Sequence, residues 1–431
     1  MLEINLETDQ LSDAWRNDTI GVLYELARRA PGQPVRVLTG ANPLLLLQDR
    51  TRVRQVLVGN ADNYTKNFGG FELLFGASRF SADGALWKQL QAVSQPFISA
   101  ARPGDVVGAS IHAFNGAADR LLGAGPGAVI VDAAMNQAAG EVIAEVTFGD
   151  HGLDIGQTVD DLRDVLRYGS QRSWNFGALV ASEDPASRGS FDAARSRLSS
   201  AIEAALDRSG TSEEGSPLLA AISQINIEGA DPVAEVAALI FAGLDTSAAS
   251  LVWGLFLLAN SQELQRHLRA EVRRTLVGGP LTVDSLQRLT DLAAFRDEVM
   301  RIFPPVPMLG RIAVAADDLH GVSVAPGQRL MLSVIGLHHD ANTFPHPAQV
   351  QLSRYSGSRL EGAAAQSYLP FGGGKRICAG VRIANVELLS GFAILLDRLE
   401  FRLADLDPPK FEWTASLRRR GGQPLIVLPA K

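Results

Sequence analysis

The only cysteine of the chain, Cys378, lies in a segment whose composition can prepare a thiol for chemistry. A glycine-rich stretch, residues 371–374, precedes it, and an apolar stretch of helical composition, residues 381–399, follows it. Glycines let a backbone approach a flat ligand closely, and amides at the start of a helix stabilise a thiolate. A thiolate ligand to haem iron requires these conditions, so the segment favours that chemistry.

Two other interpretations of this segment can be weighed. A lone cysteine beside a glycine-rich turn can also be a small buried core residue without reactivity. A phosphate-binding loop would need Ser or Thr after Lys375, where the chain has Arg376. A ligand thiolate and a structural cysteine therefore remain as the two alternatives.

A carboxylate and a hydroxyl lie next to each other in a second segment, residues 231–260, which is otherwise almost wholly apolar. Asp231 is a suitable N-cap for a helix here, and Glu235 and Asp245 are the only charged residues inside it. The Asp245 carboxylate and the Thr246 hydroxyl can relay protons, and Gly243 would let the helix widen to admit a small molecule. A helical Thr that bonds back to a carbonyl is the alternative, but a carboxylate in so apolar a helix favours a function.

The elements that must position these residues are mostly helices. Apolar residues recur at helical spacing over 86–122, 133–147 and 159–206. Strand signals are confined to 35–38, 44–47, 328–334 and 423–427, and the first two predict a hairpin that enters a helix at Thr51. The prediction is a mainly α fold with small β-sheets, and no repeat or linker divides it, so residues 1–431 form a single domain.

The helix over 231–260 is also long and apolar enough to cross a membrane. A carboxylate near the centre of a membrane span is costly, and Asp245 lies there, so a buried helix in a globular protein is favoured. The first 18 residues mix charged and apolar side chains, which is unlike a signal peptide or a membrane anchor. We therefore expect a cytoplasmic protein without a membrane partner.

Composition narrows the possible partners. The net charge is −7 and no run of basic residues occurs, which disfavours nucleic acid. One cysteine excludes an internal disulfide, and the histidines show no zinc-binding spacing. Neither a flavin-binding Gly-x-Gly-x-x-Gly nor clustered cysteines occur, so any electrons must come from another protein.

The cysteine segment resembles the ligand loop of the cytochrome P450 family. The family pattern Phe-x-x-Gly-x-Arg-x-Cys-x-Gly is matched at Phe371, Gly374, Arg376, Cys378 and Gly380. Residues 242–247 likewise resemble the family's oxygen-side motif, and the resemblance extends over nearly the whole chain. It implies the cytochrome P450 fold, with haem b held between the long central helix and the cysteine loop and with the Cys378 thiolate as the axial iron ligand.

The resemblance also implies roles for individual residues. Arg376 and Arg311 would bind the haem propionates, while Gln91 stands where the family usually has an arginine, which weakens one haem contact. Further haem contacts are implied for Trp87, Phe371, Gly372, Gly380 and Ala242. Glu298 and Arg301, three apart on a helix, would form with Arg354 a buried network that braces the loop under the haem.

The implied activity is a monooxygenase that uses dioxygen, two electrons and two protons to hydroxylate a small organic substrate, in bacterial secondary metabolism. Electrons would come from a ferredoxin-type partner and its reductase, docked near Lys88, Lys375 and Arg382. Helices over about 160–208 would form a lid. The candidate substrate contacts are aromatic and apolar residues: Phe71, Phe75, Phe80, Leu309 and Trp174.

Two rival functions stay open at this point. A haem-thiolate enzyme can instead catalyse an atypical oxidation, such as C–C or C–N coupling, nitration or peroxygenation. The Asp245 and Thr246 pair disfavours purely peroxide-driven chemistry but does not exclude coupling. The other rival is a helical binding or scaffold protein in which Cys378 is only structural.

Overall fold

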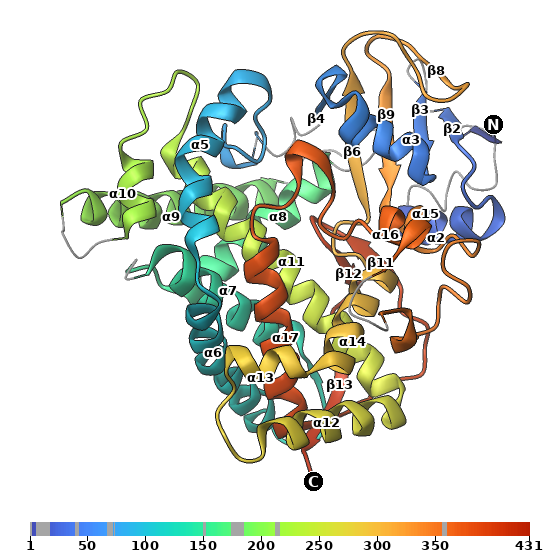
Figure 1. Cartoon of the computed structure of the whole chain (residues 1–431). Helices are drawn as coiled ribbons and strands as arrows, with labels where there is room; N and C mark the ends of the chain where they lie inside the picture. Colours follow the sequence, from blue (N-terminus) through green and yellow to red (C-terminus); the bar gives the residue numbers. More distant parts are fainter. Residues whose placement is uncertain are drawn as a thin grey trace.

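A computed structural model describes residues 2–5, 18–38, 43–66, 72, 74–149, 152–173, 185–211, 216–355 and 360–431. Helices form most of the molecule, and a sheet-rich part lies beside them at the upper right of Figure 1. The predicted fold class, mainly α with small sheets, is confirmed.

The largest sheet has six strands in the order β1-β2-β3-β9-β6-β4. They are β1 (Leu2–Asn5), β2 (Val35–Leu38), β3 (Leu44–Leu47), β9 (Arg329–Ser333), β6 (Met308–Ala313) and β4 (Tyr64–Lys66). The predicted hairpin of β2 and β3 is confirmed, and α3 (Arg50–Arg54) follows it. Strand β6 was not predicted, because its buried positions do not alternate regularly.

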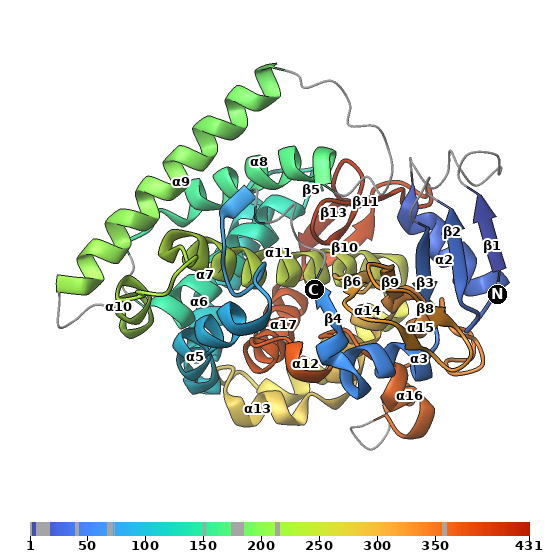
Figure 2. The same ribbon diagram turned by 90° about the horizontal axis from the view of Figure 1, so that it is seen from above.

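The helices cover the rest of the core. The helical stretch predicted over 86–122 contains two helices, α5 (Gly84–Ala100) and α6 (Pro103–Gly123), because Pro103 has no amide to continue α5 and suits the first turn of α6. Likewise, the region 159–206 contains α8 (Ile155–Ser173) and α9 (Pro185–Thr211). Figure 2 shows α9 along the edge of the molecule, packed on α8.

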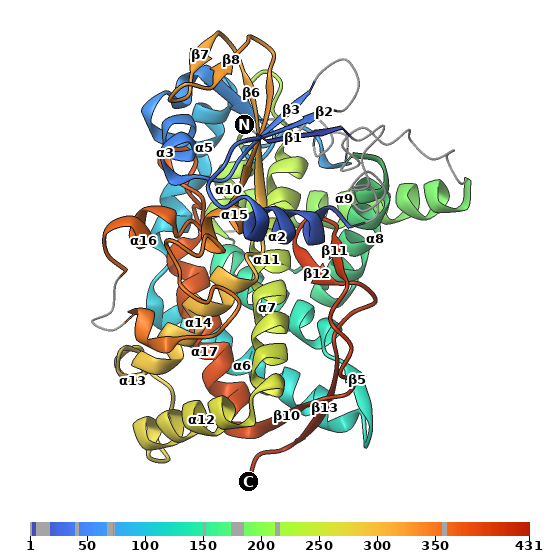
Figure 3. The same cartoon turned by 90° about the vertical axis from the view of Figure 1, so that its right-hand side faces the viewer.

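The central helix α11 (Pro232–Asn260) confirms the prediction for this segment. The Asp231 carboxylate accepts hydrogen bonds from the amides of Val233 and Ala234, so it caps the helix as expected. Figures 1 and 3 show α11 through the middle of the molecule, beside α7 (Asp132–Phe148) and α17 (Val381–Arg398), which it contacts. Among the described residues it is the one helix long and apolar enough to span a membrane, and most of its apolar surface is buried in the core.

The remaining elements complete the frame. The other helices are α2 (Thr19–Arg29), α10 (Pro217–Ser223), α12 (Gln262–Leu276), α13 (Val283–Arg288), α14 (Thr290–Ile302), α15 (Val334–His338) and α16 (Gly362–Ser367). The other strands are β5 (Ala128–Ile130), β7 (Asp317–Asp318), β8 (Ser323–Val324), β10 (Leu399–Leu403), β11 (Phe411–Trp413), β12 (Leu417–Arg419) and β13 (Pro424–Pro429). Strands β11 and β12 form a hairpin that borders the cavity and that the sequence did not predict.

Candidate functional site

The cysteine segment is a tight loop that delivers Cys378 to the start of α17. The Cys378 amide donates to the Phe371 carbonyl over 3.0 Å, which closes the loop. Gly374 has a φ of +68°, and a Cβ at this position would overlap the carbonyl oxygen of Leu57. Glycine is therefore required at position 374 for two reasons: its φ is positive, and the loop packs directly against the Leu57 carbonyl.

A cavity of about 330 Å³ lies between this loop and α11. The Cys378 side chain is accessible from it. The wall formed by α11 includes small and hydroxyl-bearing residues, beside the apolar Ala238, Leu239 and Phe241: Ala242, Gly243, Thr246, Ser247 and Ser250. Cys378 and these residues thus line one cavity, most of whose exposed wall is apolar.

The surroundings of Cys378 disfavour the thiolate form of its side chain unless a metal ion binds the sulfur. Burial raises the pKa of the Cys378 thiol, whereas the Gly380 amide and the positive charge of Arg79 lower this pKa in part. Coordination to a metal ion removes the proton outright. The site is therefore built to form a thiolate when a metal centre supplies the missing positive charge.

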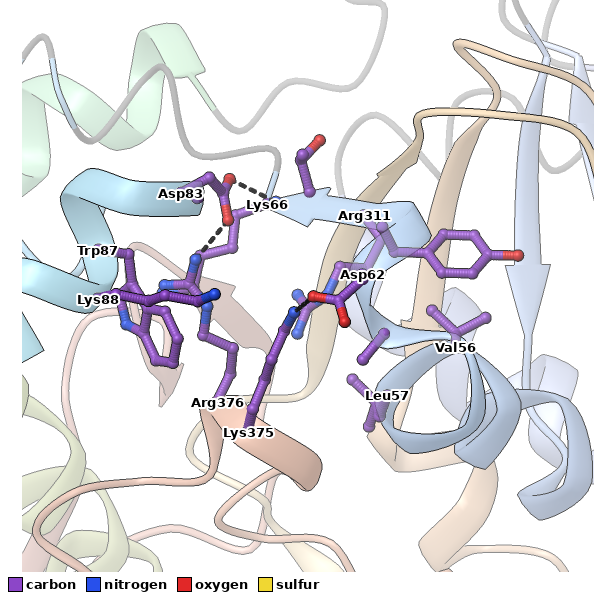
Figure 4. Close-up of a pocket in the computed structure, with 14 residues that line it drawn as sticks. Val56, Leu57, Asp62, Lys66, Asp83, Trp87, Lys88, Arg311, Lys375 and Arg376 are labelled. Carbon is purple, nitrogen blue, oxygen red and sulfur yellow. Dashed lines mark hydrogen bonds and ion pairs between the residues drawn. The ribbon is translucent and has the colours of Figure 1, made fainter.

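A cluster of cations lines both this cavity and a smaller pocket, which Figure 4 shows. Lys66 on β4 and Arg311 on β6 are directly opposite each other in the antiparallel register, and Arg376 of the cysteine loop lies over the Trp87 ring, 3.8 Å from its centroid. Like charges at opposed positions of two strands repel. Asp83 offsets part of this charge, since it accepts from Arg376 Nη2 over 2.5 Å and from the Lys66 amide over 2.8 Å.

The pKa values of these cations show how strongly they are desolvated. Burial, together with the positive charges of Arg376 and Arg311, lowers the pKa of Lys66 to about 7. Burial lowers the pKa of Arg376 to about 10 in the same way. A single carboxylate, that of Asp83, does not balance three cations, so the arrangement favours an anionic ligand at this end of the cavity.

The comparisons with known proteins agree with this geometry. The family model of cytochrome P450 matches residues 192–424, which is more than half of the chain. The chain belongs to the cytochrome P450 family. Proteins of this family are oxidoreductases that bind haem through an axial cysteine thiolate and oxidise small molecules with dioxygen and electrons from redox partners.

Individual P450 relatives are distant. Cytochrome P450 6l1 of Blattella germanica is 22% identical over 415 residues, which cover 90% of this chain and 82% of that protein. Cyclooctatin synthase of Streptomyces melanosporofaciens is 29% identical over 233 residues, which cover 52% of this chain and 51% of that protein. Human cytochrome P450 4V2 is 32% identical over 155 residues, 36% of this chain and 30% of that protein.

The cavity of this P450 suits haem b. It offers one thiol for the iron, an extensive apolar wall for the macrocycle and the cation cluster for the two propionates. At Gly380, a Cβ would meet no protein atom within 4 Å, and at Gly372 only Leu309 lies that near, at 3.9 Å. These two glycines therefore border the space that a flat ligand needs.

The structure brings most of the predicted site residues to this cavity. The following predicted residues line it with Cys378: Trp87, Gln91, Ala242, Thr246, Arg311, Phe371, Gly372, Arg376, Gly380, Phe80 and Leu309. Phe75 does not line it; this residue is buried in the core, with its ring stacked on that of Phe241 at a centroid distance of 6.0 Å. Phe71 and Trp174 lie outside the described residues.

The predicted acid and alcohol on α11 are separated by the structure. Thr246 lines the cavity, and its hydroxyl donates to the Ala242 carbonyl over 2.9 Å, which is the back-bonded arrangement. Asp245 does not line the cavity, because its carboxylate accepts from Arg418 over 2.6 Å. The expected widening at Gly243 is absent from α11 as described; a Cβ there would overlap Ile143, so close packing on α7 explains this glycine.

The predicted brace is present; Glu298 and Arg301 are completely buried, and Arg354 is partly exposed. Arg301 donates from Nε and Nη2 to the two oxygens of Glu298 over 2.5 and 2.9 Å, and Arg354 Nε lies 3.5 Å from the same carboxylate. Arg301 Nη1 also donates to the His338 carbonyl, and the His338 ring accepts from the Leu369 amide. The brace thus reaches the cysteine loop through His338 and not directly.

Sequence reasoning missed three charged residues of the cavity wall: Lys66, Arg79 and Glu387. Glu387 is the only carboxyl group among the described residues that line this cavity. Its Oε2 accepts from the Ser247 hydroxyl over 2.7 Å, and its buried Oε1 has no hydrogen-bond partner in the described part of the chain. Burial raises the pKa of Glu387 to about 8. One signal could have found it, a lone acid on the otherwise apolar face of residues 381–399.

Proposed function

We propose that this P450 binds haem b with Cys378 as the axial thiolate and hydroxylates a small, mostly apolar organic molecule. The observation that carries the proposal is one cavity that joins the chain's only cysteine, the hydroxyl-bearing face of α11 and an under-neutralised cation cluster. The mostly apolar remainder of the wall favours an apolar substrate, with Phe80 and Leu309 among its contacts.

The chemistry divides between cofactor and protein. When bound, the haem supplies dioxygen activation and oxygen transfer, with electron donation from the thiolate. Arg376, Arg311 and Lys66 bind the two propionates and so orient the ring, which offsets the cation missing at Gln91. Thr246 holds a hydroxyl group at the cavity face of α11, where it can pass a proton onward.

Glu387 of α17 supplies a protonated acid next to α11. Its pKa of about 8 keeps the proton on the carboxyl group at neutral pH. Glu387 accepts a hydrogen bond from Ser247, the residue that follows Thr246 on α11. A carboxyl group that is protonated near the working pH is suited to donate protons into the cavity.

We expect the free energy of unfolding to depend on pH because Glu387 is buried in its protonated form. Folded Glu387 keeps a proton that the unfolded chain releases, so its contribution to the free energy of unfolding falls as pH rises from about 4.5 to about 8. Glu387→Gln should remove this slope, a change on the order of 3 kcal/mol across the window. Urea unfolding at several pH values measures it.

The exposed Glu263 of α12 offers a matched control for that experiment. Glu263→Gln should leave the pH dependence of the wild type unchanged. A Glu387→Gln variant with the same slope as the wild type would contradict the assignment of a protonated buried acid.

We also propose a ferredoxin-type electron donor and a cytoplasmic location. Lys88, Lys375 and Arg382 are exposed, as an acidic carrier would require, and Lys375 forms an ion pair with Asp62. The similarity to cyclooctatin synthase of a Streptomyces supports a role in bacterial secondary metabolism. The single membrane-length helix, α11, is mostly buried in the core, which supports a protein that does not span the membrane.

Oxygen labelling tests hydroxylation against its rival. The purified protein, a surrogate ferredoxin and its reductase would be supplied with NADPH and a library of apolar substrates under labelled dioxygen. Hydroxylation predicts one labelled oxygen atom in the product. Products without label would instead support coupling or another atypical oxidation.

A further inference from the structure

The acid in the first turn of the central helix, Glu235, is completely buried. Its Oε2 accepts from the backbone amide of Arg79 over 2.7 Å, and its Oε1 accepts from the Ser94 hydroxyl of α5 over 3.1 Å. A buried carboxylate is costly unless its oxygens are bonded, and these two hydrogen bonds meet that need. Glu235 therefore joins three separate segments: α11, α5 and the loop that carries Arg79.

The loop before α5 follows the start of α11 closely. The Asp231 amide donates to the Ala77 carbonyl over 3.3 Å. Gly76 has a φ of +93°, and a Cβ at this position would lie only 2.9 Å from the Asp231 carboxylate. The bond from the Arg79 amide to Glu235 is the next contact along the helix. Three successive contacts thus fix the path of this backbone against α11.

The side chain of Arg79 ties the same loop to α5. Its Nη1 donates to the Ser94 hydroxyl and its Nη2 to the side-chain oxygen of Gln95, each over 2.8 Å. The Ser94 hydroxyl therefore bonds both Arg79 and Glu235 in one buried junction. Arg79 lines the cavity, whereas Glu235 is not among the described residues that line it. Glu235 can thus affect the cavity only through the loop.

The residue that follows Arg79 forms part of the cavity wall. Phe80 lines the cavity, and its ring meets that of Phe241 on α11 edge-on, at a centroid distance of 5.7 Å. Lys66 Nζ donates to the Phe80 carbonyl over 2.7 Å. Lys66 is also a proposed propionate ligand, so bound haem competes for it, while Glu235 lies outside the cavity wall. The Glu235 bond is therefore the attachment of Phe80 that haem leaves in place.

We propose that Glu235 is the positioning residue of Phe80 and so determines which substrates this P450 accepts. Its carboxylate fixes the Arg79 amide, which sets the Phe80 ring against Phe241 as an aromatic surface for an apolar ring of the substrate. The inference rests on the proposed function, because it assigns the substrate selectivity of the same cavity.

Glu271 of α12 offers a matched control away from the cavity wall. It is 5% exposed, and its carboxylate accepts from the backbone amides of Asp291 and Leu292, both over 2.9 Å, and from the Thr290 hydroxyl over 3.4 Å. Glu235→Leu and Glu271→Leu each remove a buried carboxylate that bonds backbone and hydroxyl donors. Only the first of these carboxylates contacts the loop before α5.

The test is the binding of azoles to the haem-loaded ferric protein, followed by the Soret shift when the azole nitrogen coordinates the iron. The Kd of imidazole divided by that of 4-phenylimidazole measures what the cavity gains from a phenyl ring, since both ligands form the same iron bond. We expect Glu235→Leu to lower this ratio about threefold to tenfold, the scale of one aromatic contact. Glu235→Gln, which keeps an acceptor for the Arg79 amide, and Glu271→Leu should both keep the wild-type ratio.

A double-mutant cycle tests whether Glu235 acts through Phe80. Phe80→Ala should lower the ratio by itself, and adding Glu235→Leu should lower it no further. If Glu235→Leu does not fold, Ser94→Ala takes its place in the cycle, because it removes the hydroxyl that Glu235 and Arg79 share. Its expected drop is smaller and in the same direction.

Three outcomes would overturn the inference. The first is an unchanged ratio in Glu235→Leu. The second is an equal drop in Glu271→Leu, which would mean a general loss of stability. The third is a further drop when Glu235→Leu is added to Phe80→Ala, which would mean that Glu235 does not act through that ring. Failure of the proposed function is seen separately, because the wild type would then lack the spectrum of thiolate-bound haem.

Discussion

Arg301→Leu should lower the free energy of unfolding by about 3–5 kcal/mol, the usual cost of removing one partner from a buried ion pair. The Glu298 carboxylate would remain fully buried, with the Gln351 amide and the Tyr355 hydroxyl at 2.9 and 3.4 Å and the more distant Arg354 Nε at 3.5 Å as its partners. Arg301 also bonds three backbone carbonyls, those of His338, Pro347 and Gln349. The midpoint of urea unfolding measures the loss.

Arg102 and Asp105 give a control with the same spacing. They form a two-point ion pair, three residues apart, with distances of 2.9 and 3.0 Å, but 79% and 49% of the two side chains are exposed. Arg102→Leu should therefore cost no more than about 1 kcal/mol. The account of the brace fails if Arg301→Leu costs no more than Arg102→Leu.

Cys378→Ser should abolish oxygen-driven turnover while leaving the fold intact. A serine hydroxyl does not supply the electron donation that a thiolate gives to haem iron. The Cys378 side chain is accessible from the cavity, so the free energy of unfolding of the haem-free protein should change by less than about 1 kcal/mol. Turnover, haem content and urea unfolding should be measured on the same preparations.

The two arms of that experiment answer different questions. Retained turnover in Cys378→Ser would remove Cys378 from the chemistry. Loss of the fold in the haem-free variant would favour the structural cysteine of a scaffold protein. A folded, inactive variant is the result that the proposed function requires.

Local patterns in the sequence predicted the parts of the site that lie within one segment. The N-cap at Asp231, the apolar run of α11 and the glycines before Cys378 each specify their own backbone, so these elements appear where they were expected. The Glu298 and Arg301 pair was predicted for the same reason, since side chains three positions apart lie next to each other on one face of a helix.

Contacts between distant segments could not be predicted in this way. Arg418 lies 173 residues from Asp245, and nothing in either segment indicates that they meet. Lys66 is opposite Arg311 only because β4 pairs with β6. Strand β6 was not predicted, since its buried and partly exposed residues do not alternate regularly. The sequence analysis therefore paired Asp245 with Thr246 and could not foresee that its carboxylate binds Arg418 instead of lining the cavity.

The spectrum of the reduced wild-type protein with carbon monoxide tests the central claim most directly. Thiolate ligation by Cys378 predicts a strongly red-shifted Soret band, and the band should be absent from Cys378→Ser with equal haem content. A folded, haem-loaded wild type without that band would contradict the assignment of Cys378 as the iron ligand.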